Sequence, residues 1–234
     1  MALFAGLYVY DSTLLLYCNE ALLIPNGRSG WATRFGSTNF TLKGKELCVP
    51  NLFLPAQVLL RLAWNVGGSK NASVDRFIAA RSAFTKFVPL VWSLALATFG
   101  LLPFSLFGKQ GEFFILLSFI LIYTNVLVIV LFLWLDRHGL GLTGKKFALM
   151  AIDILICPPF ALNIIRKLSL SMLFKDDLIN VARQLQTLSG WNETRVELLN
   201  RLNEEITLAD ELSERLPELI ALRDELLSEA PNVD

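Results

Sequence analysis

The sequence predicts a mainly α-helical, polytopic membrane protein with a transmembrane helical hairpin, a small β-containing insertion and a C-terminal helical, coiled-coil-like tail. Hydrophobic residues make up 54% of the 234 residues, and the mean hydropathy of +0.52 is high for a soluble domain. Two stretches, 87–108 and 113–135, contain no charged residue. At about 1.5 Å per residue, a helix over either stretch is long enough to cross a hydrocarbon core of about 30 Å.

The first apolar stretch, residues 2–24, is also long enough to span a membrane, but it contains Asp11, Asn19 and Glu20. Carboxylates in hydrocarbon are costly unless they are paired or face water. The stretch therefore has two interpretations. It is a transmembrane segment with its acids in a protein-lined interior, or it is a strand pair or amphipathic segment packed on the rest of the chain. It lacks the basic n-region of a signal peptide, so we expect it to be retained.

Residues 25–85 are predicted to form a basic cytoplasmic region that contains short strands and an amphipathic helix. They carry eight Lys or Arg against two Asp or Glu. Asn26-Gly27 is a turn signal, and the alternating pattern beyond it predicts a small hairpin or meander with turns at Gly36 and Gly44. Helices are then expected over two further ranges, 54–64 and 72–84.

Residues 86–136 are predicted to form the transmembrane hairpin, because only residues 109–112 separate the two apolar stretches. Trp92 and Trp134 then fall at the same membrane face, as interfacial tryptophans often do. Asn125 lies near the middle of the second stretch, where it either donates an interhelical hydrogen bond or lines a pore. Basic residues flank the hairpin on both sides, so the positive-inside rule predicts cytoplasmic flanks and an external link.

Residues 137–175 are predicted to combine a glycine-rich loop with a proline-broken apolar segment. The loop places three glycines close to Arg137, His138, Lys145 and Lys146. It either cradles a phosphate or a lipid head group, or it is a basic cytoplasmic loop that needs tight turns.

The apolar segment 147–165 is interrupted by Asp153 and by Pro158-Pro159, which break a helix near its centre. Basic pairs flank the segment on both sides, the second being Arg166 and Lys167, whereas a span would place one pair outside. We therefore favour a re-entrant or interfacial segment that leads to a surface helix, with a kinked span as the alternative. Asp153 is a candidate proton relay or cation ligand, or it pairs with a lysine two turns before it.

Residues 176–234 form an acidic tail with five Lys or Arg against fourteen Asp or Glu. We expect one helix that ends at Gly190 and another that begins near Asn192 and is kinked or restarted at Pro217. The pattern predicts a coiled coil or partner-binding stalk over 192–229, or a helical hairpin folded back on the chain's own β region. The apolar stripe of this tail consists of Leu199, Leu202, Ile206, Ala209, Leu212, Leu216 and Leu219.

Composition also narrows the classes of function. Three scattered cysteines and one histidine offer neither metal-ligand spacing nor a nucleophilic triad. No catalytic residue, metal or cofactor is predicted. The expected partners are membrane lipids and either further copies of the chain or a protein bound through the tail, and no nucleic acid is expected.

The first function predicted is that of an integral membrane scaffold or assembly subunit, located in a bacterial inner (plasma) membrane with 25–85 and the tail in the cytoplasm. The alternative is a small oligomeric channel or transporter that uses the intramembrane polar residues Asp11, Glu20, Asn125 and Asp153. The third is a membrane enzyme that acts on lipid head groups. The candidate head-group or phosphate contacts are Arg137, His138, Lys145, Lys146, Arg166 and Lys167.

Overall fold

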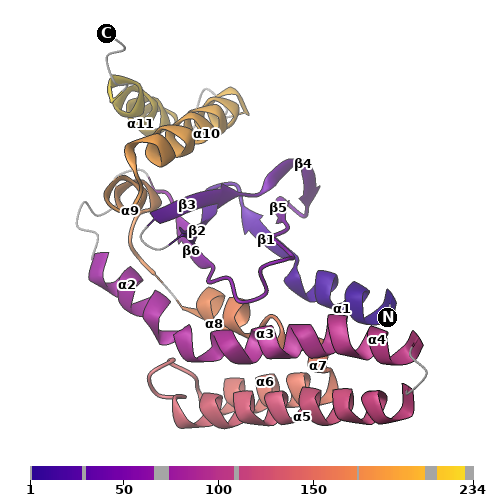
Figure 1. Cartoon of the computed structure of the whole chain (residues 1–234). Coiled ribbons are helices and arrows are strands. Elements are labelled where there is room, and N and C mark those ends of the chain that lie inside the picture. The colour runs from indigo at the N-terminus through magenta and orange to yellow at the C-terminus, as the bar shows by residue number, and fades with distance from the viewer. Residues whose placement is uncertain are drawn as a thin grey trace. The chain divides into compact units, whose positions relative to one another are not determined.

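The computed structural model is mainly helical and contains two small sheets (Figure 1). It describes residues 2–27, 30–65, 74–107, 111–172, 174–208 and 215–229. The chain divides into two compact units. The first, called the helical unit, consists of Met1–Leu15, Leu47–Leu60 and Asp75–Leu173. The second, called the mixed unit, consists of Leu16–Glu46, Arg61–Val74 and Phe174–Asp234.

The helical unit is dominated by two long helical stretches that pack side by side (Figure 1). The first stretch contains α2 (Val74–Ala83), the short 3-10 helix η1 (Thr85–Phe87), α3 (Val88–Leu96), the π-helical turn η2 (Ala97–Leu101) and α4 (Leu102–Phe107). The second is α5 (Gly111–Leu135), which packs against α3, η2 and α4. The hairpin predicted from the short link is therefore present in the fold.

The remaining helices of this unit are shorter. They are α1 (Ala2–Ser12), α6 (Gly144–Ile156), α7 (Pro158–Ala161) and α8 (Ile164–Ser171). α6 packs on α5, and α7 packs on α1, α5 and α6. The predicted proline break is confirmed: α6 ends before Cys157, whose backbone is extended, and α7 starts with proline in its first turn.

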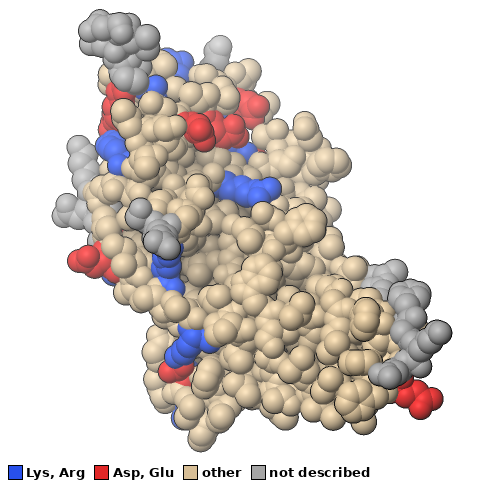
Figure 2. Space-filling model, viewed as in Figure 1, with Lys and Arg blue, Asp and Glu red and all other residues tan. Residues whose placement is uncertain are grey.

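Two helical stretches are long and apolar enough to cross a membrane by length and composition, Val74–Leu106 with 33 residues and Gly111–Leu135 with 25. Within the most apolar window of each, only 33% and 28% of the residues are buried in the chain. The core helix of a soluble protein would be mostly buried. Figure 2 shows that the surface over α3, α4 and α5 is almost free of charged side chains.

The mixed unit is built around two three-stranded sheets, with strand orders β1-β5-β4 and β3-β2-β6. The strands are β1 (Leu14–Tyr17), β2 (Glu20–Asn26), β3 (Gly30–Phe35), β4 (Ser37–Leu42), β5 (Lys45–Cys48) and β6 (Leu60–Ala63). β2 and β3 are antiparallel, with Ala21 opposite Phe35 and Asn26 opposite Gly30. Gly27 and Gly44 have φ of 62° and 73°, which confirms the predicted turns at these two glycines.

Three helices complete the mixed unit: α9 (Leu178–Leu185), α10 (Leu188–Leu208) and α11 (Leu216–Ser228). α9 and α10 pack on β3, and α10 packs on α11. Leu202 and Leu219 of the apolar stripe are buried inside the unit. The interpretation as a helical hairpin on the chain's own strands is therefore confirmed, whereas Ala209 and Leu212 lie outside the described residues.

Two sequence predictions about individual elements were wrong. Residues 54–64 contain strand β6 and no helix, because Leu60 and Leu62 alternate into the core and Trp64 N–H donates to the Asn19 carbonyl at 2.9 Å. Gly190 does not end a helix but lies inside α10, whose first turn is capped by Thr187 Oγ1 accepting from Gly190 N–H.

Residues 2–24 had two interpretations, a single span or a packed segment. α1 ends at Ser12, and β1 and β2 follow, so the packed interpretation is the correct one for this stretch. An 11-residue helix is about half the length that a span requires.

Candidate functional site

A buried polar cluster lies in the helical unit, and we call it the Arg166 network. It joins the C-terminal half of α1, the loop 51–54 and the junction between α7 and α8. Its side chains are Tyr8, Asp11, Ser12, Asn163, Arg166 and Lys167. Because these segments are far apart in sequence, the network connects the start of the chain with the segment that follows the proline break.

Arg166 is 2% exposed and makes four hydrogen bonds, all to uncharged oxygens. One terminal nitrogen donates to Ser12 Oγ at 2.9 Å and to Asn163 Oδ1 at 3.0 Å. The other donates to the carbonyls of Asn51 at 2.7 Å and Leu54 at 2.8 Å. Burial lowers the pKa of the Arg166 guanidinium from its ordinary value, but an arginine in a protein remains protonated. The side chain thus fixes the loop on α8 by charge-assisted bonds.

Asp11 is linked to the Arg166 guanidinium through Asn163, which forms a hydrogen bond with each of them. Its carboxylate pairs with Lys167 Nζ at 2.8 Å and accepts from Asn163 Nδ2 at 3.1 Å. The structure therefore brings together a residue predicted for an intramembrane polar site and two predicted for head-group contacts. Tyr8 completes the cluster, since its hydroxyl donates to the Leu52 carbonyl at 2.7 Å and burial raises the pKa of its phenol.

The other three candidates for an intramembrane path have separate local surroundings. Asn125 of α5 donates to Ser93 Oγ at 3.2 Å and to the Leu121 carbonyl at 2.8 Å. Asp153 is exposed on α6 and forms no ion pair within the described residues. Glu20 belongs to the mixed unit, where it lies 3.9 Å from Arg61 and accepts from Tyr17 N–H. Within the helical unit, the described residues show no hydrogen bond or ion pair that joins Asn125 or Asp153 to Asp11.

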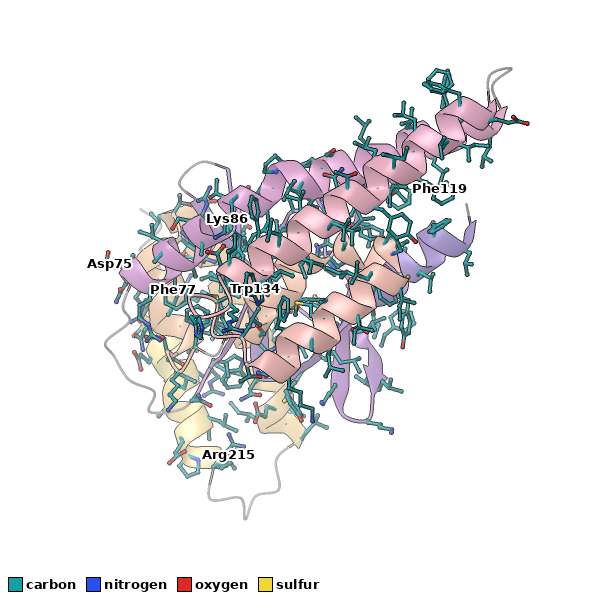
Figure 3. The ribbon with its side chains drawn as sticks, turned by 90° about the horizontal axis from the view of Figure 1, so that it is seen from below. Asp75, Phe77, Lys86, Phe119, Trp134 and Arg215 are labelled. Atoms are coloured by element: carbon teal, nitrogen blue, oxygen red, sulfur yellow. The ribbon has the colours of Figure 1, made fainter. Side chains whose placement is uncertain are left out.

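The basic loop after α5 is well ordered by its own backbone. Leu142 N–H donates to the Arg137 carbonyl at 2.8 Å, and Arg137 Nε lies 3.2 Å from His138 Nε2. Lys145 and Lys146 are exposed in the first turn of α6. Next to this loop, Asp136 forms an ion pair with Lys86, which is labelled in Figure 3 beside the end of α5 that carries Trp134. The first turn of α6 thus presents Lys145 and Lys146 at the surface.

The mixed unit contains a second buried arginine, which the sequence analysis did not single out. Arg201 of α10 is 5% exposed, and its guanidinium bonds to both carboxylate oxygens of Glu46 at 2.8 and 2.7 Å. It also donates to the Gly36 carbonyl at 2.7 Å and to Glu197 at 3.0 Å. A Cβ atom at Gly36 would lie 2.5 Å from Glu46 Cβ, so glycine is required here for close approach and not only for a turn.

An apolar cavity of about 500 Å³ lies in the helical unit between α1, residues 52–55 and the α3–η2 stretch. Val9, Phe53, Trp92 and Phe99 are among the side chains that line it, and Tyr8 supplies its only hydroxyl. No sequence pattern indicated it, because its three walls come from segments separated by tens of residues.

The described parts of the chain show little that suits covalent chemistry. Within them, no three His, Cys, Asp or Glu side chains gather to hold a metal ion. The three cysteines form no disulfide with one another, and Cys18 is exposed whereas Cys48 is buried. No family model, curated protein or solved structure matches the chain. The arrangement therefore offers packed anchoring, charged surfaces and an apolar cavity, which are features of binding.

Proposed function

We propose that this chain is an integral membrane scaffold or assembly subunit, anchored by the α3–α5 hairpin and presenting its acidic helical tail to a partner. The observation that carries the proposal is the exposed apolar surface of the hairpin. Phe104, Phe113 and Leu116 are 66%, 66% and 60% exposed, and the polar Asn125 is turned inward to Ser93. This is the inverse of a water-exposed helix pair and is what a hydrocarbon solvent favours.

Positive charge supports an orientation for this anchor. The basic flanks before α3 and after α5 include Lys86, Arg137 and Lys145, whereas the link 109–112 carries a single basic residue, Lys109. By the positive-inside rule, the link faces outward and residues 25–85 and the tail are cytoplasmic. The proposed location is an inner (plasma) membrane.

The partner surface proposed for the tail is its outer acidic face. Three leucines of the tail are buried within the mixed unit, so they are not available to form a coiled-coil interface: Leu198, Leu202 and Leu226. Exposed carboxylates remain, and in Figure 2 acidic atoms gather over α10 and α11. The ones we assign to the partner surface are Glu193, Glu204 and Glu218. Such a face suits a partner with a basic surface, in a contact weakened by salt.

The channel alternative has less support. Asp11 is neutralised by Lys167, and Asn125 is satisfied within the hairpin. A conducting path requires polar groups that line one continuous route. The described residues offer the pair Asp11–Lys167, an inward Asn125 and an exposed Asp153 on different helices.

The anchor and its orientation are tested by thiol labelling in a cysteine-free variant. We expect Ser228→Cys to react with an impermeant maleimide only after permeabilisation, because α11 is cytoplasmic. Glu112→Cys is the matched control and should react in intact cells. Recovery of the chain in the soluble fraction would contradict the anchor, and labelling of both sites in intact cells would contradict the orientation.

The tail's role is tested by removing its exposed charge. Glu193→Gln, Glu204→Gln and Glu218→Gln together should abolish chemically cross-linked complexes of the chain in intact cells while leaving it in the membrane fraction. The matched control is Glu112→Gln with Asp153→Asn, which removes exposed acids from the helical unit. Cross-linked complexes that persist at the same yield in the triple variant would refute the acidic face as the partner surface.

A further inference from the structure

The apolar cavity of the helical unit has the form of an open groove, and we call it the α1–η2 groove. One wall is α1, with Val9 and Tyr8, and another is the loop that carries Phe53. The third is the helical stretch through Trp92 and Phe99. Its volume of about 500 Å³ lies in the range of about 300–1,000 Å³ that is usual for small-ligand sites.

The π-helical turn η2 shapes the floor of this groove. A π turn uses wider i→i+5 bonding, and such turns inside α-helices are frequently found at functional sites. Gly100 lies on the groove within this turn, and a Cβ atom there would stand 3.3 Å from Leu96 Cδ1. The ring of Phe99 meets Tyr8 edge to face, with centroids 5.7 Å apart. This contact joins η2 to α1 beside the groove.

A second apolar hollow of about 380 Å³ adjoins the first across Leu96 and Gly100. It is lined by residues of η2 and α4, including Phe104, and by Leu121 of α5. Leu96 is 71% exposed and is the partition between the two hollows. The apolar surface is therefore continuous along the face of the first candidate span.

The chemistry of the groove defines the class of ligand. Among the described residues, no charged side chain lines either hollow. Tyr8 has the only hydroxyl in the lining of the groove, and that hydroxyl is already used by the Leu52 carbonyl. Phe53 and Trp92 are 87% and 45% exposed at the groove, an arrangement that water disfavours. A ligand of this groove must therefore present hydrocarbon. The described lining offers no charged side chain that could bind a polar end of the ligand.

We propose that the α1–η2 groove binds an acyl chain of a membrane lipid. The proposal rests on the proposed membrane anchor, because α3 and η2 form a wall of the groove and belong to a candidate span. If that span is inserted, the hydrocarbon that reaches this face is lipid, and Trp92 lies where interfacial tryptophans contact it. Because the groove offers no charged contact, the site selects for the chain and not for the head group.

The experiment uses the full wild-type chain in lipid bilayers. A phosphatidylcholine with a diazirine at the end of one acyl chain is included in trace amount, activated by light, and its adducts are mapped by mass spectrometry. We expect adducts in the groove segments around Phe53 and Trp92–Gly100 at least five-fold above those on the lipid-facing surface of α5. A phosphatidylglycerol probe with the same chain should give the same ratio.

Two variants make the result specific. Gly100→Phe fills the groove and should reduce adducts at the groove segments to the α5 level. The matched control, Leu127→Phe, adds the same ring at an exposed position of α5 and should leave the groove adducts unchanged. Should Gly100→Phe misfold, Ala95→Phe, which fills the same groove from α3, gives an independent reading.

The outcomes separate this inference from the anchor on which it rests. Adducts on α5 without enrichment at the groove would overturn the acyl-chain site while leaving the anchor intact. That result would also follow if a second copy of the chain or another protein covers the groove. Absence of adducts on α5 as well as on the groove would overturn both, since α5 would then not face lipid.

Discussion

Two of the buried arginines, Arg166 and Arg201, are held in opposite ways. Arg166 of the helical unit has only uncharged oxygens as hydrogen-bond partners, and two of them are backbone carbonyls of one loop. Arg201 of the mixed unit is paired with Glu46 across two short bonds and also reaches Glu197. Both guanidinium groups are at least nine-tenths buried.

This difference in partners indicates which part of the structure each arginine holds in place. Carbonyl partners make Arg166 a residue that fixes the backbone, because losing it removes one donor from each of these oxygens but leaves no opposite charge unpaired. The carboxylate partner makes Arg201 half of an ion pair, so removing it strands a buried anion. The helical unit thus uses its arginine to hold a loop, and the mixed unit uses its arginine to join a helix to β5.

The largest effect is expected at the ion pair. Arg201→Met should lower the free energy of unfolding of the mixed unit by about 3–5 kcal/mol, because Glu46 is left buried without its cation. Fluorescence in a Trp92→Phe, Trp134→Phe background isolates this unit, since the remaining tryptophans, Trp31, Trp64 and Trp191, all belong to it.

The matched double variant decides the cause. Adding Glu46→Gln to Arg201→Met should restore more than half of the loss, because the stranded charge is gone. A double variant as unstable as Arg201→Met alone would show that the packing of the guanidinium, and not the stranded carboxylate, sets the cost.

A smaller and more local effect is expected at Arg166. Arg166→Met removes the guanidinium donors from the carbonyls of Asn51 and Leu54 and leaves them only the turn bonds from Leu54 and Gln57 N–H, at a cost of about 2 kcal/mol to the loop. Amide hydrogen exchange over residues 51–57 should then accelerate roughly 30-fold, by the relation of tenfold for each 1.4 kcal/mol. Arg166→Lys retains the charge but not the fork of donors, so its exchange rate should lie between those of the wild type and Arg166→Met. Equal rates in all three chains would contradict the assignment of Arg166 to the loop.

The smallest effect is expected at Asp177, a buried carboxylate that, like Arg166, forms hydrogen bonds with backbone groups. Asp177 caps α9 and accepts from the backbone N–H groups of Asn65 and Asn180 at 3.0 and 3.2 Å. Burial is the main cause that raises the pKa of Asp177 above its ordinary 3.8. The protonated acid is thus favoured by folding. Its contribution to stability is complete below pH 3.8 and is lost as pH rises through the folded-state pKa.

Asp177→Asn removes this titration while retaining a capping oxygen, so the two chains should differ by less than about 1 kcal/mol at pH 7. Between pH 7 and pH 4, the unfolding free energy of the wild type should rise relative to that of the variant, in the same fluorescence assay. A wild type that loses stability relative to the variant on acidification would show that its hydrogen bonds outweigh desolvation.

Sequence reasoning reached the features that local pattern controls. The hairpin followed from two charge-free stretches and a short link, and the proline break and the turns at Gly27 and Gly44 followed from backbone restrictions. Asp11, Arg166 and Lys167 were singled out individually. Their assembly was not foreseen, since Asn163 and the 51–54 carbonyls complete it from distant parts of the chain.

The misses have a common physical origin in tertiary contacts. The segment 54–64 has the residue spacing of a short amphipathic helix, but pairing with β2 makes part of it a strand. In the sequence, Arg201 is one charge among many in an acidic helix, and only the fold brings it to Glu46. Gly36 was assigned only to a turn, because the sequence does not show that the Glu46 side chain packs against this glycine.

The π turn at Ala97–Leu101 has a consequence for how this protein can change over generations. A π turn holds one residue more than an α turn, and each residue of an α-helix rotates the chain by about 100°. Loss of a single codon in this turn would therefore convert it to an ordinary α turn and displace the residues of the turn that line the groove, while α4 would keep its face. The shape of this apolar surface therefore depends on the number of residues in the turn as well as on their identity. A single deletion is enough to change it.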